Sequence, residues 1–266
     1  MAAAAALAHN GYGQMIDSQT LRAALITGAG RRIGAAIARA LARVGYAVVL
    51  HAQHSRADAE ALAGEIKAAG GRAAVVLADL ADAEAVRGLV PAAATFGPLS
   101  LLVNNASLFN EDEFGALERS AFERTLAVNL TAPLLLAQAF AVQAPAGASI
   151  VNIVDQRVLK PTPRFFSYAV SKSALHSATV MMAQALAPKL RVNAVAPGPT
   201  LPSPRQSAAE FAAQAATVPL GRGPTPEDVA AAVVYLAGAE SVTGTVIAVD
   251  GGQHIAWHTV DSIGVE

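Results

Sequence analysis

Two residues that could transfer a proton, Tyr168 and Lys172, stand four positions apart in a stretch that predicts a helix over 168–187. Side chains at i and i+4 share one face of a helix, so we expect the phenol and the ammonium group to lie close together. A free phenol has a pKa of about 10 and is a poor acid at neutral pH, but a nearby positive charge lowers that pKa. The pair therefore indicates a proton donor working beside a hydride-donating cofactor, with an ordinary surface pair as the alternative.

A glycine-rich segment, Thr27-Gly28-Ala29-Gly30-Arg31-Arg32-Ile33-Gly34, lies between a predicted strand at 22–27 and a predicted helix at 33–44. Glycines in such a turn let the backbone approach a pyrophosphate, and the following helix offers free N–H groups to that anion. Glycine turns without a ligand are common, but this one has the strand before it and the helix after it. The segment therefore predicts a dinucleotide site.

The end of the next predicted strand, at 46–51, indicates which dinucleotide binds. An Asp or Glu there would accept a hydrogen bond from the ribose 2′-hydroxyl and favour NAD. The sequence instead continues with His54, Ser55 and Arg56, and its first carboxylate is Asp58. These donors, together with Arg31, suit a 2′-phosphate. We therefore predict NADPH as the cofactor, the alternative being an ordinary polar start to a helix.

Apolar segments without polar alternation alternate with longer helical stretches along the whole chain. Such strands, separated by helices, are typical of a parallel sheet covered on both faces. The sequence predicts an α/β fold: one Rossmann-type, doubly wound domain over 21–266, preceded by a flexible arm at 1–20 and including a Pro- and Gly-rich substrate loop at 198–225. The predicted strands are 22–27, 46–51, 72–77, 99–103, 149–154, 190–195 and 245–249, and the predicted helices are 33–44, 58–69, 83–96, 119–129, 130–142, 168–187 and 226–237.

The bulk composition limits the partners. Of 266 residues, 53% are hydrophobic and 15% charged, the net charge is −1, and there is no cysteine. The chain thus lacks the basic field that would attract nucleic acid or anionic lipid, and it excludes disulfides and thiolate metal sites. No His-Glu-x-x-His spacing indicates a metal. The Ala-rich start at 1–10 has no basic region of the kind a signal peptide needs, and no apolar run approaches the ~20 residues of a membrane span. We expect a cytoplasmic protein that binds neither membrane nor nucleic acid.

Five motifs in order along 21–253 carry a resemblance to the short-chain dehydrogenases/reductases: Thr27-Gly28…Gly34, Asn104-Asn105-Ala106, Asn129, Tyr168-x-x-x-Lys172 and Pro197-Gly198. The resemblance implies that Asp79 and Leu80 flank the adenine, that Asn104 and Asn105 close the cofactor groove, and that Asn129 holds a water behind Lys172. It also implies a homotetramer with the 168–187 helix in a subunit interface. The implied cofactor-binding residues are Gly28, Arg31, Arg32, Ile33, His54, Ser55, Arg56, Asp79, Leu80, Asn105, Ala106, Ser107, Tyr168, Lys172, Pro197, Gly198 and Thr200.

Three positions depart from the common pattern of these enzymes and resemble the pteridine reductases and dihydromonapterin reductases. Arg32 replaces a glycine of the turn, Asp155 replaces the serine thirteen residues before Tyr168, and Ser107-Leu108-Phe109 follows Asn104-Asn105-Ala106 where a glycine usually follows the alanine. By this resemblance Arg32 reaches cofactor phosphate and pterin, Phe109 sandwiches the pterin, and Asp155 and Tyr168 form the proton-donating pair. Ser107 adds a polar contact.

The chemistry agrees with a pterin, a flat, nitrogen-rich ring that suits stacking on an aromatic side chain. Reduction of its C=N bond needs a hydride on carbon and a proton on nitrogen, and a carboxyl beside Tyr168 supplies that proton more readily than a serine hydroxyl. Two alternatives remain open: a general NADPH-dependent carbonyl reductase, and a non-catalytic NADPH-sensing or scaffold protein. The loop at 198–225 carries no readable motif, so the natural substrate is not defined by the sequence.

Overall fold

A seven-stranded parallel sheet forms the centre of the computed structural model, which describes residues 22–203 and 205–257. The spatial order is β3-β2-β1-β4-β5-β6-β7, so the chain reverses its direction of travel across the sheet between β3 and β4. Ligands of such sheets bind at the carboxyl ends of the strands where the order reverses. The strands are β1 (Ala23–Ile26), β2 (Ala47–Ala52), β3 (Ala73–Leu77), β4 (Leu99–Asn104), β5 (Ser149–Ile153), β6 (Arg191–Pro197) and β7 (Val246–Val249).

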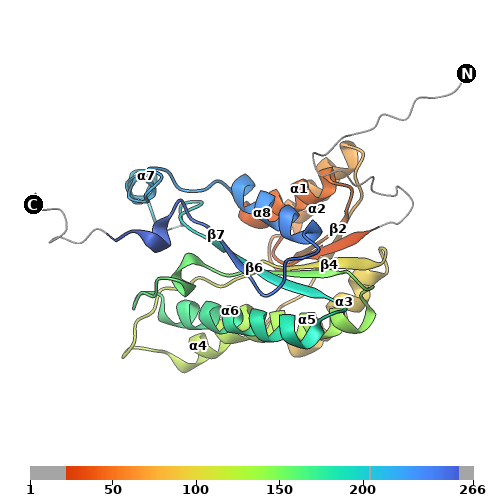
Figure 1. Ribbon diagram of the computed structural model, residues 1–266, viewed down its shortest axis with the longest axis horizontal. Helices are drawn as coiled ribbons and strands as arrows, with labels where there is room; N and C mark the ends of the chain where they lie inside the picture. The colour runs from red at the N-terminus through yellow and green to blue at the C-terminus, as the bar shows by residue number, and fades with distance from the viewer. Residues whose placement is uncertain (1–21, 204, 258–266) are drawn as a thin grey trace, which may run out of the picture.

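Helices cover both faces of this sheet (Figure 1). Successive side chains of a strand point to opposite faces, so Ala24 and Ile26 pack into one core and Ala23 and Leu25 into the other. Both faces are buried, which explains why the strands carry apolar runs without alternation. One face holds α1 (Arg32–Arg43), α2 (Arg56–Ala68) and α8 (Pro226–Gly238), and the other holds α3 (Ala83–Ala94), α4 (Arg119–Leu126), α5 (Ala132–Gln143) and α6 (Phe166–Leu186).

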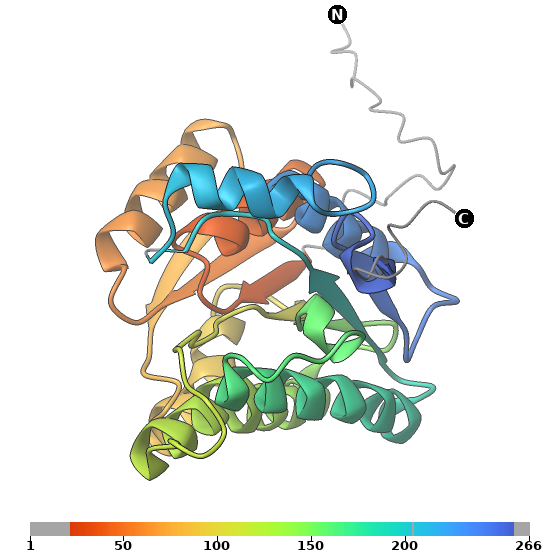
Figure 2. The ribbon, with the colours of Figure 1, turned by 90° about the vertical axis from the view of Figure 1, so that its left-hand side faces the viewer.

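The predicted seven-stranded Rossmann-type sheet is confirmed, and each predicted strand and helix overlaps an observed one. The segment predicted as a loop at 198–225 differs, because it contains a further helix, α7 (Ala208–Ala216). Ser207 and Glu210 form a capping box that starts this helix. Figure 2 shows α7, in light blue, lying across the upper front of the molecule, above the ends of the strands. The predicted arm at 1–20 lies outside the described residues.

A π-helical turn, Ala127–Thr131, joins α4 and α5 into one continuous run, where the sequence predicted two helices. The run Arg119–Gln143 is, among the described residues, the one stretch with the length and apolar composition of a membrane span. This differs from the expectation that no such stretch exists. Leu136 and Phe140 of the run are fully buried in the core, as in a core helix of a globular domain. The absence of membrane binding stays a prediction.

Candidate active site

A cavity of about 660 Å³ opens at the carboxyl ends of β1, β4, β5 and β6 and is bounded on its outer side by α7. Many of the predicted site residues line it: Arg32, Ile33, Asn105, Ser107, Phe109, Asp155, Tyr168, Lys172, Pro197, Gly198 and Thr200. Predicted residues that lie away from its lining are Gly28, Arg31, His54, Ser55, Arg56, Asp79, Leu80, Ala106 and Asn129.

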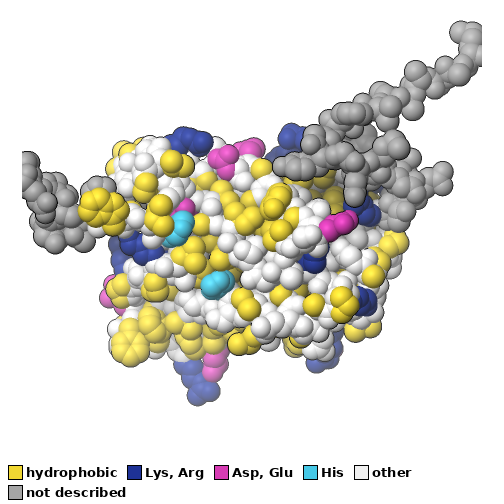
Figure 3. Space-filling view, in the orientation of Figure 1, with side chains coloured by type: hydrophobic (Ala, Val, Ile, Leu, Met, Phe, Trp, Pro, Cys, Tyr) yellow, Lys and Arg dark blue, Asp and Glu magenta, His cyan; other side chains and the backbone are white. Residues whose placement is uncertain are grey.

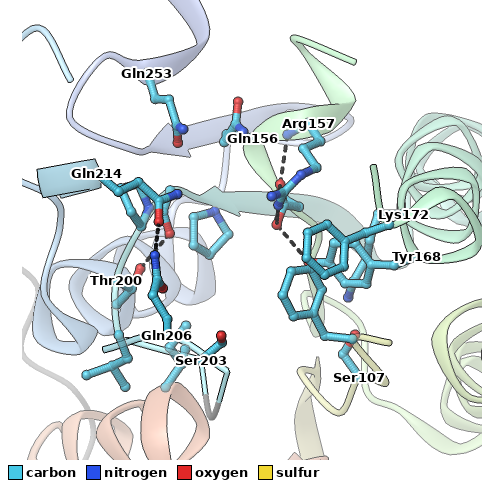
Figure 4. A pocket seen from close by; sticks show the side chains of 18 of the residues that line it. Ser107, Gln156, Arg157, Tyr168, Lys172, Thr200, Ser203, Gln206, Gln214 and Gln253 are labelled. Carbon is cyan, nitrogen blue, oxygen red and sulfur yellow. Dashed lines mark hydrogen bonds and ion pairs between the residues drawn. The ribbon is translucent and has the colours of Figure 1, made fainter. Parts of the chain in front are cut away.

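Tyr168, Asp155 and Lys172 meet on the side of the cavity formed by β5 and α6 (Figure 4). The Tyr168 hydroxyl donates a hydrogen bond of 2.7 Å to Oδ2 of Asp155. The Lys172 ammonium donates to the backbone oxygen of Ile153 at 2.7 Å and lies 5.7 Å from the centroid of the Tyr168 ring. These contacts fix the phenol between a carboxylate and a buried ammonium, as the spacing of the residues predicted.

Arg157, which the sequence analysis did not single out, holds Asp155 from the other side. Its backbone N–H donates to Oδ1 of Asp155 at 2.8 Å, and its Nη1 lies 3.2 Å from Oδ1 and 3.1 Å from Oδ2. The side chains are only 20% and 14% exposed, so water screens this ion pair weakly. Asp155, Arg157, Tyr168 and Lys172 together are called the catalytic wall below.

Burial shifts the pKa of both proton-handling groups of the catalytic wall. Desolvation, followed by the charge of Asp155 and the hydrogen bond to it, raises the pKa of Tyr168 well above its ordinary value. The expectation that Lys172 lowers this pKa is therefore wrong for the protein without cofactor. Desolvation lowers the pKa of Lys172 from 10.5 to about 8, against the opposing charge of Asp155. Tyr168 thus retains its proton across the neutral range and is available as a donor.

An aromatic cluster lies beside the catalytic wall. Phe109 stacks on Phe165 with 4.3 Å between ring centroids and 15° between planes, and it meets Tyr168 edge-on at 4.6 Å. The guanidinium carbons of Arg157 and Arg205 lie 5.5–5.6 Å from the centroids of both phenylalanine rings. The sequence predicted Phe109, whereas Phe165 and Arg205 come from distant segments that no local motif marks.

Asn129 lies in the π-helical turn and is fully buried. Its Oδ1 accepts from the backbone N–H of Leu108 at 2.8 Å and from the hydroxyl of Ser107 at 3.2 Å. Its Nδ2 donates to the oxygen of Leu108 at 2.9 Å and to Oγ of Ser171 at 3.1 Å. These four bonds fix the segment that carries Phe109. The predicted water behind Lys172 stays a prediction.

The glycine-rich turn packs closely against the end of β4. Gly28 has φ +63°, and a Cβ atom there would lie 2.9 Å from Cα of Ala106, so no larger residue fits. Oγ1 of Thr27 accepts from the backbone N–H groups of Asn105 and Ala106 at 2.9 and 3.0 Å. The side chain of Asn105 donates to the oxygen of Thr27 at 2.8 Å. Of the two predicted groove-closing residues, Asn105 therefore braces the turn directly, whereas the side chain of Asn104 donates to Oδ1 of Asn152 at 2.9 Å.

Arg32 begins α1 in the left-handed conformation, with φ +55°. Its guanidinium donates to the backbone oxygens of Pro202 at 2.9 Å and Leu201 at 3.3 Å. The arginine that replaces a glycine thus links the turn to the segment leading into α7. Its position on the cavity lining agrees with a residue able to reach both a phosphate and a substrate.

The predicted 2′-phosphate donors gather at the start of α2. Arg31 pairs with Asp58 at 3.4 Å and Arg56 with Glu60 at 2.7 Å, both at exposed positions. Ser55 lies against the turn, since a Cβ atom on Gly30 would be 2.8 Å from its Oγ. Exposed ion pairs are worth little, so these arginines can turn to an anion at small cost.

Four glutamines on the cavity lining were not predicted. The Oε1 atom of Gln156 is buried and has no hydrogen-bond partner. Gln206 donates to Gln214 of α7 at 2.7 Å, and Gln253 faces the same space (Figure 4). Gln206, Glu210, Phe211 and Gln214 are called the α7 wall below. Within residues 22–203 and 205–257, no group of three or more His, Cys, Asp or Glu side chains could hold a metal ion.

The sheet order and the site together define a class: a Rossmann-type protein whose carboxyl edge can hold a dinucleotide beside a buried, protonated tyrosine. The family model described as enoyl-(acyl carrier protein) reductase matches residues 28–254. An uncharacterised oxidoreductase of Methylorubrum extorquens is 40% identical over 245 residues, which cover 87% of this chain and 97% of that protein. The chain therefore belongs to this family of short-chain dehydrogenases/reductases and is an oxidoreductase.

Solved structures of similar proteins add detail. FolM alternative dihydrofolate reductase 1 from Brucella canis, complexed with NADP, is 48% identical, with a TM-score of 0.87 and coverage of 91% of this chain and 96% of that one. The enzyme of the same name from Brucella suis, also in complex with NADP, is 48% identical, with a TM-score of 0.88 and coverage of 92% and 99%.

Proposed function

We propose that the protein is an NADPH-dependent reductase of pterin-type substrates, a dihydropterin or a dihydrofolate, and that it adds hydride to a ring C=N bond. The observation that carries the proposal is the 2.7 Å hydrogen bond from Tyr168 to Asp155. A carboxylate at this place suits a substrate that presents N–H donors and a ring nitrogen. The two Brucella enzymes, which are named as dihydrofolate reductases, support the same reading.

NADPH would supply the hydride. The turn from Gly28 to Ile33 would hold its pyrophosphate, and Arg31, His54, Ser55 and Arg56 would hold its 2′-phosphate. The fit of the turn rests on the close approach of Gly28 to Ala106, which a Cβ atom would prevent. We expect a preference for NADPH over NADH of at least about tenfold in kcat/KM, the value of one good charged contact. Equal kcat/KM for the two cofactors would contradict this assignment.

The chain's own residues would then move one proton. Tyr168 retains its proton because burial and Asp155 raise its pKa, and it lines the cavity. Asp155 is held by Arg157 in an orientation in which Oδ2 receives that hydroxyl. Lys172, protonated below about pH 8, places a positive charge beside the phenol as the proton leaves it. Asp155 and Tyr168 thus act as a coupled pair.

The aromatic cluster would bind the ring. Phe109 lines the cavity and is already stacked on Phe165, so a pterin between Phe109 and the nicotinamide would extend an existing stack. The unpartnered Oε1 of Gln156 on the same lining is an acceptor suited to an amino group of a substrate. Both features favour a flat ring bearing N–H groups over a flexible aliphatic ketone.

A general carbonyl reductase is the second candidate, because Tyr168 with Lys172 can protonate a carbonyl oxygen equally well. A non-catalytic NADPH sensor would not need Tyr168 and Lys172 in this buried, hydrogen-bonded arrangement.

The deciding experiment measures kcat/KM with NADPH for a dihydropterin, dihydrofolate and an activated ketone. The proposal expects turnover of at least one pterin. Efficient ketone reduction with no pterin turnover would refute it, and no NADPH oxidation with any substrate would favour the sensor.

The oligomeric assembly is proposed by family resemblance. Hydrophobic side chains are spread over the face of the molecule that carries α5, α6 and α8 (Figure 3). Val142, Met181 and Tyr235 of these helices are 81%, 65% and 52% exposed in the single chain. Such exposure supports a homotetramer with α6 in an interface, which light scattering on the purified protein would test. We also propose a cytoplasmic location, because a chain without cysteine fits a reducing compartment.

A further inference from the structure

His51 lies near the end of β2 and is only 2% exposed. The backbone N–H of Gly28 donates to its Nδ1 at 3.1 Å, and its Nε2 lies 3.1 Å from the backbone oxygen of Ala78. A carbonyl oxygen can only accept, so Nε2 carries the hydrogen, and an Nδ1 that receives an N–H must be bare. The two contacts therefore define a neutral imidazole in a single tautomer.

The two partners of this imidazole belong to different parts of the proposed cofactor site. Gly28 is in the turn that would hold the pyrophosphate, and Ala78 directly precedes Asp79 and Leu80, which would flank the adenine. The backbone oxygen of His51 also accepts from Ala29 of the turn at 2.9 Å. One residue thus fixes the position of the turn and its distance from the adenine segment.

The surroundings of His51 favour the neutral form. Burial lowers its pKa below the ordinary 6.5, against smaller opposing effects of the Ala78 carbonyl and the charge of Asp79. Asp79 is the charged group that acts on the ring, and it is itself paired with Arg124 at 3.3 Å and influenced by His54. Protonation of His51 would direct a new N–H at the N–H of Gly28, so the bond that holds the turn would be lost.

We propose that His51 is a positioning residue of the cofactor site: its neutral ring ties the Gly28 turn to the Ala78–Leu80 segment, and NADP(H) binds less tightly when that ring is protonated. The proposal goes beyond catalysis on any particular substrate, and it rests on the NADP(H) part of the proposed function. It predicts an acid-sensitive cofactor affinity set by a residue that lies beneath the turn.

The wild-type protein contains an internal control for this contact. The N–H of Gly28 bonds the titrating ring, whereas the neighbouring N–H of Ala29 bonds the backbone oxygen of His51, which does not titrate. Hydrogen exchange at single-residue resolution, without cofactor, would compare these two amides from about pH 8 to about pH 5, across the range in which histidine titrates. We expect the Gly28-to-Ala29 ratio of protection factors to fall on acidification. A constant ratio would overturn the proposal.

Two conservative variants of His51 separate the bond to Gly28 from the bond to Ala78. In His51→Asn, the amide oxygen can take the place of Nδ1 and does not titrate, while in His51→Gln the longer amide reaches toward Ala78 and leaves Gly28 unbonded. Calorimetric titration with NADP⁺ at about pH 8 should give a Kd for His51→Asn within about threefold of wild type, and a Kd for His51→Gln about tenfold higher.

The pH dependence then isolates the imidazole. The 2′-phosphate of NADP⁺ itself titrates near pH ~6, so wild type and His51→Asn share that contribution. Between about pH 8 and pH 5, the Kd of wild type should rise about two- to fivefold more than that of His51→Asn, because the pKa of His51 lies below 6.5 and only part of the protein is protonated at the lower pH. Equal pH dependence, or equal Kd values for the Asn and Gln variants, would overturn the proposal. If His51→Gln does not fold, the comparison of wild type with His51→Asn still decides.

Failure of the proposed function would look different. A wild-type protein that bound no NADP⁺ at any pH would refute the cofactor assignment and the effect on affinity that depends on it. The amide-exchange ratio would still report separately whether His51 holds the turn, because that measurement needs no cofactor.

Discussion

The two sides of the active-site cavity, the catalytic wall and the α7 wall, are built in opposite ways. Tyr168 and Lys172 of the catalytic wall are buried, and each makes a 2.7 Å hydrogen bond to β5 or the residues just after it. The helix of the α7 wall has no buried residue, and Gln206 and Gln214 bond mainly to each other. The groups proposed to perform the chemistry are therefore fixed before a ligand arrives, while the groups on the outer side can adapt to it.

Replacing Asp155 is the strongest test of the catalytic wall. Asp155→Ser should lower kcat for a dihydropterin by about 10²–10⁴, the usual range for loss of a positioned acid–base group. NADPH affinity should be unchanged, because Asp155 bonds only Tyr168 and Arg157 among the contacts described. Steady-state kinetics with a dihydropterin and an activated ketone would measure both effects.

A matched variant is Arg87→Gln, which removes an exposed ion pair with Glu84 on α3, far from the cavity lining, and should leave both activities unaltered. Retained pterin turnover in Asp155→Ser would show that the carboxylate is structural.

Removing an aromatic ring tests where the substrate lies. Phe109→Ala should weaken pterin binding by about 1–3 kcal/mol, the cost of a lost stacking surface, with little change in NADPH affinity. Phe165→Ala should have a smaller effect, because Phe165 stacks on Phe109 and supports it. Dissociation constants for a pterin in the presence of NADP⁺ would decide. An unaltered pterin affinity in Phe109→Ala would assign this ring to ordinary packing.

The pKa of Lys172 predicts an alkaline limit to activity. This pKa is lowered to about 8 by burial, so the charge beside Tyr168 is lost as pH rises through 8, and kcat/KM should then fall by up to about tenfold per pH unit. The loss of activity would not come from destabilisation of the fold by deprotonation of Lys172. The unfolded chain binds this proton up to pH 10.5 while the folded one releases it near 8, so Lys172 makes stability rise over that window. A flat profile between pH 7 and 9 would contradict the prediction.

The smallest effect should come from the α7 wall. Gln214→Ala breaks the bond to Gln206 on an exposed helix and should raise the KM for a pterin by about two- to fivefold with kcat nearly unchanged, the value of one exposed hydrogen bond. Kinetics with two pterins that differ in side chain would show whether the change depends on that side chain. A fall in kcat comparable to that of Asp155→Ser would remove the distinction between the two walls.

Local motifs were sufficient to predict one part of the site. The glycine turn, the Tyr168–Lys172 spacing and the apolar strands each depend on residues within a few positions of one another, and the structure shows the strands and the Tyr168–Lys172 contact as predicted. The pKa of Tyr168 was predicted in the wrong direction, because spacing reveals the neighbouring ammonium but not the depth of burial.

The other part could not be predicted because it depends on which distant segments meet. Arg157, Phe165 and Arg205 come from three separate segments and converge on Phe109 only in the folded chain. Helix α7 is different, since its capping box, Ser207-Ala208-Ala209-Glu210, is a readable start signal that the surrounding Pro and Gly residues obscured.

One side chain, Arg32, joins the cofactor turn to the segment that leads into α7. A guanidinium has five N–H donors; two of them are used for the oxygens of Leu201 and Pro202, and three remain. A bound phosphate that accepts hydrogen bonds from the Arg32 guanidinium therefore contacts the same planar group that bonds the backbone at 201–202. Cofactor binding and the position of the α7 segment are then thermodynamically linked, and by reciprocity whatever stabilises one stabilises the other. A lysine would preserve the charge and lose this coupling, since its single ammonium has no such plane.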